Sequence, residues 1–298
     1  MSIHFWRVEL KPFYENKIQI MKQLLHVKFL LFLWLSLPLG CEAIQSRIIG
    51  GKNAVNRAYP FIVSIEYALD GEQFCSGSLI SPTKILTAAH CLKENQAVQI
   101  RLGTNNKNKQ VGQVIYIAEQ IRHPKFNELT LDYDVAVFTL MTPAKLSDNT
   151  NVIFFPQPCS SLNCVTGLAK SNTLVRVIGW GATSPDGNKN SASADLKDVD
   201  VPIISNTTCK NVMKYDGDVT SRMICAGFVG GGKDSCIGDS GSPLFSYLAS
   251  AKTGVQTGIA SWGGSPCAAK NTYGVYTRIS NPEINDFIRQ EMQRTLEN

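Results

Sequence analysis

Two kinds of segment are absent from this 298-residue sequence, and each absence weighs against a class of protein. No apolar run is long enough to span a bilayer: FLLFLWLSLPLG (29–40) has 12 residues, where a membrane helix needs about 20. No basic tract follows the first 47 residues, since the rest of the chain carries 23 Lys/Arg against 21 Asp/Glu. We therefore expect neither membrane insertion nor nucleic-acid binding.

The short apolar run lies where a secretory signal peptide would be. Lysines precede it and the small residues Cys41 and Ala43 follow, so we expect cleavage after Ala43 and a signal peptide over residues 1–43. A start at Met21 would give that peptide a more usual length. Removal of Cys41 leaves eight of the nine cysteines, an even number that suits disulfides in an oxidising compartment. The sequence therefore predicts a secreted, extracellular protein.

Short apolar runs separated by glycine-containing turns fill most of the chain after residue 47, which indicates an all-β barrel or sandwich. One helix is predicted at the C-terminus, over residues 282–296, because Asn281 can cap it and Ile284, Phe287 and Ile288 share a face. The runs that predict strands are FIVSIEYAL (61–69), KILTAAH (84–90), AVQIRLG (97–103), QVIYIAEQI (113–121), DVAVFTLM (134–141), TLVRVIGWG (173–181), TGIASWG (257–263) and GVYTRI (274–279).

Histidine is scarce, because the chain beyond the leader contains only His90 and His123. His123 precedes Pro124 between charged residues, which predicts a surface turn. His90 ends the apolar run of residues 84–90, where a single histidine is more often structural than catalytic. A catalytic role for His90 therefore depends on its partners.

Two further motifs supply such partners. In Gly238-Asp239-Ser240-Gly241, the glycines let the backbone turn sharply and direct N–H groups at one point, as a serine nucleophile with an oxyanion hole requires. The motif is not that of the α/β-hydrolases, because Ser242 stands where that motif has glycine. Asp134 opens an apolar run, where a buried carboxylate could orient an imidazole. The chain order of His90, Asp134 and Ser240 is one of the orders in which Ser-His-Asp triads occur.

These residues belong to seven short sequence motifs, here called family words, that resemble those of the chymotrypsin family of serine proteases, trypsin subgroup. The resemblance covers essentially residues 48–296 and implies two six-stranded antiparallel β-barrels, over about 48–157 and 165–281, followed by the C-terminal α-helix. It also implies a reaction that needs neither a cofactor nor a metal. In family order the words are IIGG (48–51), LTAAHC (86–91), DYDVAV (132–137), GWG (179–181), KDSCIGDSG (233–241), SWG (261–263) and GVYTRI (274–279).

By this resemblance, Ser240 attacks the scissile carbonyl, His90 takes and returns its proton, and Asp134 orients His90. The N–H groups of Gly238 and Ser240 form the oxyanion hole. Ser261 corresponds to the family serine that hydrogen-bonds the triad aspartate. The implied activity is peptide-bond hydrolysis in polypeptide substrates. The alternative is a binding or regulatory homologue with weak or no catalysis, although such proteins usually lack a triad residue.

The resemblance also implies cleavage after Arg or Lys. Asp234, six residues before Ser240, corresponds to the floor of the family's specificity pocket. A buried carboxylate there needs a cation, which a substrate Arg or Lys supplies. Gly263 and Gly274 match wall positions that must stay small, and Ser235 adds a hydroxyl.

Arg47–Ile48 resembles the family's activation junction, so residues 44–47 are expected to form an activation peptide. In the family, cleavage frees an α-amino group, here that of Ile48, which pairs with the aspartate beside the nucleophile, here Asp239. An arginine at the junction suits a trypsin-like activating protease, or this protein itself. We also expect protein protease inhibitors as partners and a monomeric state.

The disulfide framework carries over in the same way. Val175 and Ser246 stand where many trypsins have a further bridge, so that bridge is absent. Family positions imply the pairs Cys75–Cys91, Cys209–Cys225 and Cys236–Cys267, and leave Cys159 and Cys164 to pair with each other.

Four features depart from the family pattern or extend it. Ser242 replaces a glycine and adds a side chain in a tight region. The segment Thr104–Ala118 has no Asp or Glu, so we expect no calcium site there. Tyr273 precedes Gly274 where many trypsins have proline, which raises the hypothesis of sodium binding. Asn206 begins the single glycosylation sequon, Asn-Thr-Thr.

Overall fold

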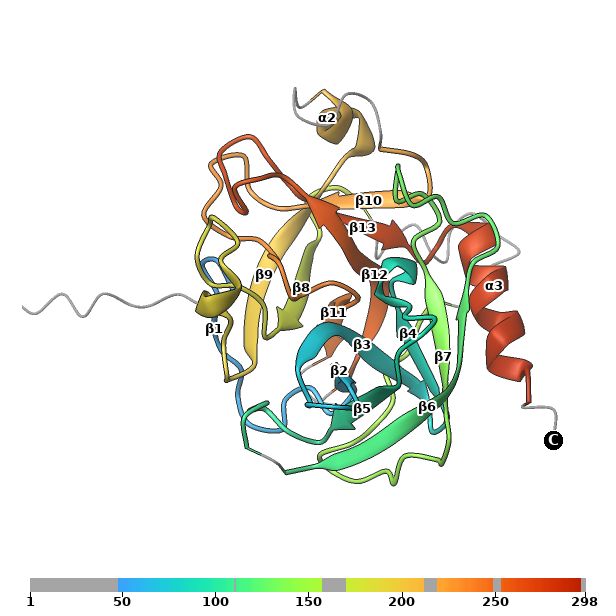
Figure 1. Cartoon of the computed structure of the whole chain (residues 1–298). Helices are drawn as coiled ribbons and strands as arrows, with labels where there is room; N and C mark the ends of the chain where they lie inside the picture. The colour runs from blue at the N-terminus through green and yellow to red at the C-terminus, as the bar shows by residue number, and fades with distance from the viewer. Residues whose placement is uncertain (1–47, 110, 157–169, 212–218, 249–252, 296–298) are drawn as a thin grey trace, which may run out of the picture. The chain divides into compact units, whose positions relative to one another are not determined.

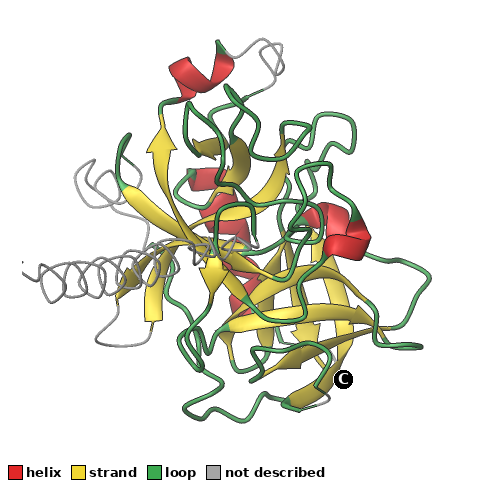
Figure 2. Cartoon of the chain, turned by 90° about the vertical axis from the view of Figure 1, so that its left-hand side faces the viewer, coloured by secondary structure: helices red, strands yellow, loops and turns green. Residues whose placement is uncertain are grey.

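The computed structural model describes residues 48–109, 111–156, 170–211, 219–248 and 253–295. The expected signal peptide (1–43) and activation peptide (44–47) lie outside these residues. The described chain is almost entirely strands and loops with few helices (Figures 1 and 2), as predicted for an all-β protein. None of these helices is long and apolar enough to cross a membrane.

The first barrel closes from six antiparallel strands in the order β2-β3-β4-β7-β6-β5. Its strands are rich in buried β-branched and aromatic residues, which pack well on a pleated surface. In chain order they are β2 (Ile62–Tyr67), β3 (Gln73–Ser81), β4 (Lys84–Thr87), β5 (Val98–Leu102), β6 (Gln113–Arg122) and β7 (Ala136–Leu140).

The second barrel follows the order β9-β10-β13-β12-β11-β8 and closes because β8 also pairs with β9. A short strand, β1 (Lys52–Asn53), adds to the outer side of β9. The six barrel strands are β8 (Leu174–Gly179), β9 (Lys197–Ile204), β10 (Met223–Ala226), β11 (Pro243–Leu248), β12 (Thr253–Gly263) and β13 (Gly274–Arg278). The prediction of two six-stranded antiparallel barrels is therefore confirmed.

One hydrophobic cluster joins the two barrels. Phe61 of the first barrel lies edge-on to Phe245 of the second, with ring centroids 5.1 Å apart, and Tyr59 lies beside both rings. Aromatic pairs in this arrangement contribute about 0.5–1.5 kcal/mol beyond the burial of their area. The contact fixes the barrels against each other, so residues from both can form one site.

The C-terminal helix α3 (Pro282–Gln293) completes this core. Asn281 caps it as predicted, because its Oδ1 accepts hydrogen bonds from the N–H groups of Glu283 and Ile284. The helix ends at Gln293 rather than at residue 296, since Arg294 has an extended backbone (φ −69°, ψ 123°).

Candidate active site

The first barrel brings His90 and Asp134 together through the pairing of two strands. Thr87, at the end of β4, lies opposite Ala136, at the start of β7. The residues just beyond this pair therefore meet at one edge of the sheet, and the 3-10 turn η1 (Ala89–Cys91) presents His90 there. His90 Nδ1 lies 2.8 Å from Asp134 Oδ2, and the His90 N–H donates to Oδ1 at 3.0 Å.

The second barrel also holds Asp134, which is fully buried. Ser261 Oγ, on β12, donates to Asp134 Oδ2 at 2.5 Å, and Thr277 Oγ1, on β13, donates to the Asp134 carbonyl at 2.6 Å. With its proton on Nδ1, facing the carboxylate, the His90 ring has its lone pair on Nε2. In this tautomer Nε2 can accept a proton, so the arrangement is suited to general-base chemistry.

Ser240 reaches the same place from the second barrel. Its carbonyl accepts a hydrogen bond from the Ser76 N–H at 2.8 Å. Gly241 has φ 81°, and a Cβ there would lie 2.2 Å from Thr87 Oγ1, so its backbone lies against the end of β4 that leads to His90. Among the described residues, Ser240 Oγ and His90 form no hydrogen bond. In such sites this bond often forms or shortens only with substrate.

Two N–H groups beside Ser240 are available to a ligand. The N–H groups of Asp239, Gly241 and Ser242 donate to backbone carbonyls. Those of Gly238 and Ser240 donate to no described residue. Gly238 has φ 96°, a conformation that favours glycine, so this turn needs the residue that the sequence supplies. Two free donors at one turn are what an oxyanion hole requires.

Ser240 and Asp234 both line a pocket of about 250 Å³. Gly263 and Gly274 line it, and a Cβ on Gly274 would lie 2.5 Å from Asp234 Oδ1, so a larger residue there would close the pocket. Ser235 lies in the same lining, and its Oγ hydrogen-bonds Tyr276 Oη at 3.0 Å. The sequence did not single out Tyr276, whose inward position follows from alternation along β13.

Asp234 is a buried carboxylate in the lining of this pocket. Its residue is only 3% exposed, and it forms no ion pair with any described residue. Burial raises its pKa to about 7, against the lowering effect of hydrogen bonds from nearby backbone groups. A cation entering the pocket would remove this penalty and favour the ionised form.

Asp239, beside Ser240, is a second buried carboxylate. It accepts hydrogen bonds from the N–H groups of Gly181 and Cys236 at 2.8 and 3.0 Å. Burial raises its pKa to about 6. A Cβ on Gly179 or Gly181 would lie within 3.0 Å of the carboxylate, which explains both glycines of the GWG motif.

The residues that follow the expected activation junction belong to the second barrel. Ile48 is fully buried among core residues of that barrel, such as Val199. Ile49 forms an isolated bridge with Asp234, whose N–H donates to the Ile49 carbonyl at 3.2 Å. Arg47 lies outside the described residues.

Three disulfides brace the site, and they join the cysteines that family positions pair. Cys159 and Cys164 lie outside the described residues. Ser246 Oγ is buried with no hydrogen-bond partner in the described structure, at a position where many trypsins have a bridge. The bonds present are Cys75–Cys91, Cys209–Cys225 and Cys236–Cys267.

Two sequence expectations are modified by the structure. The prediction that His123 lies at the surface is wrong: it is in a turn, but its ring is buried and stacked on Tyr133. Ser242 avoids the left-handed backbone region, so its cost lies elsewhere, in a buried Oγ with no partner among the described residues. Tyr273 is buried, and sodium binding beside it stays a hypothesis.

The sequon residue Asn206 is engaged in hydrogen bonds at the start of helix α2 (Asn206–Lys210). Its Nδ2 donates to the carbonyls of Thr220 and Met223 at 2.9 and 3.1 Å, and its Oδ1 accepts from Arg278. Because N-linked glycans attach at Nδ2, glycosylation would break one of these bonds.

Comparison with known proteins identifies the family to which this fold belongs. The sequence model of the family described as Trypsin matches residues 48–288. The chain is 36% identical to cationic trypsin-3 of Rattus norvegicus over 255 residues, which cover 85% of this chain and 93% of that protein. It is 38% identical to trypsin of Sus scrofa (80% and 93%) and 37% identical to trypsin-3 of Salmo salar (80% and 90%). The chain therefore belongs to the trypsin family and is a serine endopeptidase.

Proposed function

We propose that this protein is a secreted zymogen whose cleaved form hydrolyses polypeptides after Arg or Lys, with Ser240, His90 and Asp134 as its catalytic triad. The observation that carries the proposal is the carboxylate of Asp234. It is buried, has no cationic partner among the described residues, and lines the pocket that opens beside Ser240. A substrate guanidinium or ammonium group supplies the missing charge.

Each residue of the triad is assigned one role in the proposed reaction. Ser240 Oγ attacks the scissile carbonyl carbon and His90 Nε2 takes its proton. The imidazolium that forms is stabilised by the Asp134 carboxylate, 2.8 Å from Nδ1. His90 then gives the proton to the leaving amine, and water hydrolyses the acyl-enzyme by the same steps in reverse order.

The oxyanion of the tetrahedral intermediate is assigned to the N–H groups of Gly238 and Ser240. The loss of one such donor commonly costs about 3–4 kcal/mol in the transition state. Asp234 binds the side chain of the substrate residue that precedes the scissile bond. This contact places the scissile carbonyl next to Ser240 Oγ, with its oxygen at the N–H groups of Gly238 and Ser240.

Activation is assigned to cleavage of the Arg47–Ile48 bond. This step creates an α-ammonium group on Ile48, whose side chain lies in the second barrel core. Asp239 is the buried carboxylate beside the nucleophile, with a pKa raised to about 6 by burial, and the new cation would stabilise its ionised form. The arginine at the junction makes a trypsin-like protease the expected activator.

The partners and location follow from the family. We propose secretion directed by residues 1–43, a monomeric state, and inhibition by proteins that occupy the Asp234 pocket with a basic residue. The disulfides Cys75–Cys91, Cys209–Cys225 and Cys236–Cys267 suit an oxidising compartment.

The proposal is tested with a peptide library in which the residue before the scissile bond is varied over all amino-acid types. The cleaved wild type is expected to cut after Arg and Lys, and Ser240→Ala, with an unchanged melting temperature, is expected to be inactive. Cleavage by Ser240→Ala at the wild-type rate would overturn the triad. Equal cleavage after all residue types would overturn the role of Asp234.

A further inference from the structure

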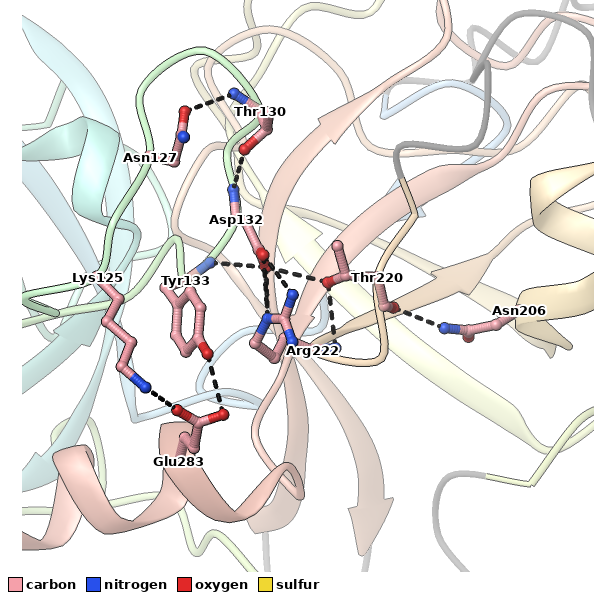
Figure 3. A network of polar contacts seen from close by, with 9 residues as sticks. All are labelled: Lys125, Asn127, Thr130, Asp132, Tyr133, Asn206, Thr220, Arg222 and Glu283. Atoms are coloured by element: carbon pink, nitrogen blue, oxygen red, sulfur yellow. Dashed lines mark hydrogen bonds and ion pairs between the residues drawn. The ribbon is translucent and has the colours of Figure 1, made fainter.

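A network of polar contacts lies immediately before Asp134 and joins three separate parts of the chain (Figure 3). Asp132 and Tyr133 come from the loop of the first barrel that precedes β7. Arg222 comes from the segment before β10 of the second barrel, and Glu283 from the first turn of α3. The network therefore crosses from one barrel to the other beside the candidate triad.

The first contact of the network is an ion pair between Asp132 and Arg222. Arg222 Nε lies 2.8 and 3.0 Å from the two carboxylate oxygens, and Nη2 lies 2.5 Å from Oδ2. Thr220 Oγ1 donates to Asp132 Oδ1 at 3.0 Å. Both charged side chains are largely buried, 16% and 23% exposed, so the pair has a fixed geometry and limited screening by solvent.

The second contact holds the ring of Tyr133. The Arg222 guanidinium lies 4.7 Å from the ring centroid, and His123 is stacked at 4.6 Å. Tyr133 Oη donates to Glu283 Oε1 at 2.9 Å, while Lys125 pairs with the other oxygen of Glu283. Tyr133 is thus fixed at its faces and at its hydroxyl.

The backbone between these contacts is in an unfavourable conformation. Leu131 has φ 52° and Tyr133 has φ 55°, values in the left-handed region that residues with a side chain rarely adopt. Asp132 lies between them, and its Oδ1 accepts a hydrogen bond from the Tyr133 N–H at 3.1 Å. Asp134 follows directly, so the direction in which its side chain leaves the chain depends on this conformation.

Resting on the triad proposed above, we infer that Asp132 and Arg222 are positioning residues for the Asp134 carboxylate. Their ion pair fixes the left-handed turn against the second barrel, the barrel that also supplies Ser261 and Thr277 to Asp134. Without the pair the turn relaxes, and the Asp134–His90 contact loses its alignment with Ser240.

The chain offers a matched control in Arg176–Asp200. This pair is also bidentate, with both distances 2.7 Å, and its guanidinium also lies over a ring, 5.0 Å from the Tyr247 centroid. It joins the neighbouring strands β8 and β9, and Arg176 Nη1 also donates to Tyr59 Oη at 2.8 Å, but the pair contacts no triad residue. Loss of this pair removes an equivalent ion pair without touching the turn before Asp134.

The test compares Arg222→Met, Arg222→Lys and Asp132→Asn with Arg176→Met in the full chain after activation. Active sites are first counted with a fluorophosphonate that labels Ser240, so that kcat refers to folded protein. We expect kcat on a small arginine amide to fall about 10- to 100-fold in Arg222→Met and Asp132→Asn, with KM within about twofold. Arg222→Lys, which keeps the charge, is expected to lose less, and Arg176→Met nothing.

A proton NMR signal separates positioning from general stability. The downfield resonance of the His90 Nδ1 proton reports its hydrogen bond to Asp134, and we expect it to shift or broaden in Asp132→Asn but not in Arg176→Met. Unchanged kcat and an unchanged resonance in Asp132→Asn would overturn the inference while leaving the triad intact. Failure of the fluorophosphonate to label wild-type Ser240 would instead overturn the proposed function, and this inference with it.

Discussion

The two barrels contribute unequal halves to the site. On the first-barrel side, the Asp134 carboxylate accepts hydrogen bonds from the His90 N–H, His90 Nδ1 and Ser261 Oγ. On the second-barrel side, Asp234 and Asp239 are buried carboxylates whose pKa values are raised to about 7 and 6 by burial. The first half is already satisfied within the protein, whereas the second needs positive charge from elsewhere.

This difference suggests a division of labour. The contacts of His90 and Asp134 are already formed, so in the proposed mechanism the base and its orienting carboxylate need no reorganisation at the moment of reaction. In the proposed mechanism, the half that recognises substrate and oxyanion depends on two cations, the α-ammonium group of Ile48 and the side chain of the substrate. Activity would then be controlled through the second barrel, and the predictions below test each half.

The largest effect is expected in the first half. Asp134→Asn would favour the wrong tautomer of His90, because the amide can donate to Nδ1, and kcat is expected to fall about 10⁴-fold. Asp200→Asn, on the surface of the second barrel, is the control and should keep full activity. A kcat within tenfold of wild type for Asp134→Asn, in active-site-titrated enzyme, would contradict the preorganised base.

A smaller but selective effect is expected at the pocket. Asp234→Ser removes the partner of a buried cation, so kcat/KM on arginine substrates is expected to fall about 10²- to 10⁴-fold. This change corresponds to a loss of about 3–5 kcal/mol of transition-state stabilisation. Substrates with a neutral side chain at that position should lose much less. A variant that still preferred arginine would refute the pocket assignment.

The raised pKa of Asp234 predicts a pH dependence of cation binding. Benzamidine, a small cation, requires the ionised carboxylate, so its affinity should rise about tenfold per pH unit below about 7 and level off above it, with release of a proton. Calorimetry in buffers of different ionisation enthalpy measures both quantities. Equal affinity at pH 5.5 and pH 8 would contradict the raised pKa.

The same group links pH to stability, with the opposite sign from a paired carboxylate. Because the folded pKa lies above 3.8, the ordinary value for an aspartate, the folded state without a bound cation holds this proton more tightly than the unfolded state. Its contribution to the unfolding free energy is therefore fully present below about pH 4 and is lost as the pH rises towards 7. Asp234→Asn should remove this part of the pH dependence in denaturant titrations.

The smallest effect concerns Ser242, whose buried Oγ has no partner in the described structure. Ser242→Ala removes an unsatisfied polar group and should raise the unfolding free energy by about 1 kcal/mol. Thr87→Val is the contrast, since Thr87 Oγ1 donates to the Ser76 carbonyl at 2.8 Å and its loss should destabilise the fold. A lower melting temperature for Ser242→Ala would show that this hydroxyl is satisfied in solution.

Much of the fold could be predicted from the sequence, but not evenly. Eight apolar runs correspond to strands, whereas β3 (Gln73–Ser81), β9 (Lys197–Ile204), β10 (Met223–Ala226), β11 (Pro243–Leu248) and the short β1 (Lys52–Asn53) were not predicted. β3 is rich in serine and β9 contains proline and charged residues, so neither has the apolar pattern of an isolated strand. Pairing with neighbouring strands, which a single sequence does not reveal, decides their conformation.

The candidate site could be located through motifs, but its supporting contacts could not. Ser261 and Gly274 were carried over from family words, and the structure places both in the lining of the Asp234 pocket. Asp132 and Thr277 also lie in family words, but their contacts with Arg222 and the Asp134 carbonyl could not be predicted, because these partners are far apart in sequence. His123 was misassigned to the surface, since its stacking on Tyr133 depends on tertiary packing.

In this account, the second-barrel half of the site needs an added cation, whereas the first-barrel half does not. The rate at which a fluorophosphonate labels Ser240 tests this difference most directly. The rate is measured in the intact chain, in the chain cut at Arg47–Ile48, and in the cut Asp239→Asn variant, all at pH 7. We expect fast labelling only in the cut wild-type chain, because only there can the α-ammonium group of Ile48 pair with the Asp239 carboxylate. Equally fast labelling of the intact chain, or of the cut Asp239→Asn variant, would contradict the account.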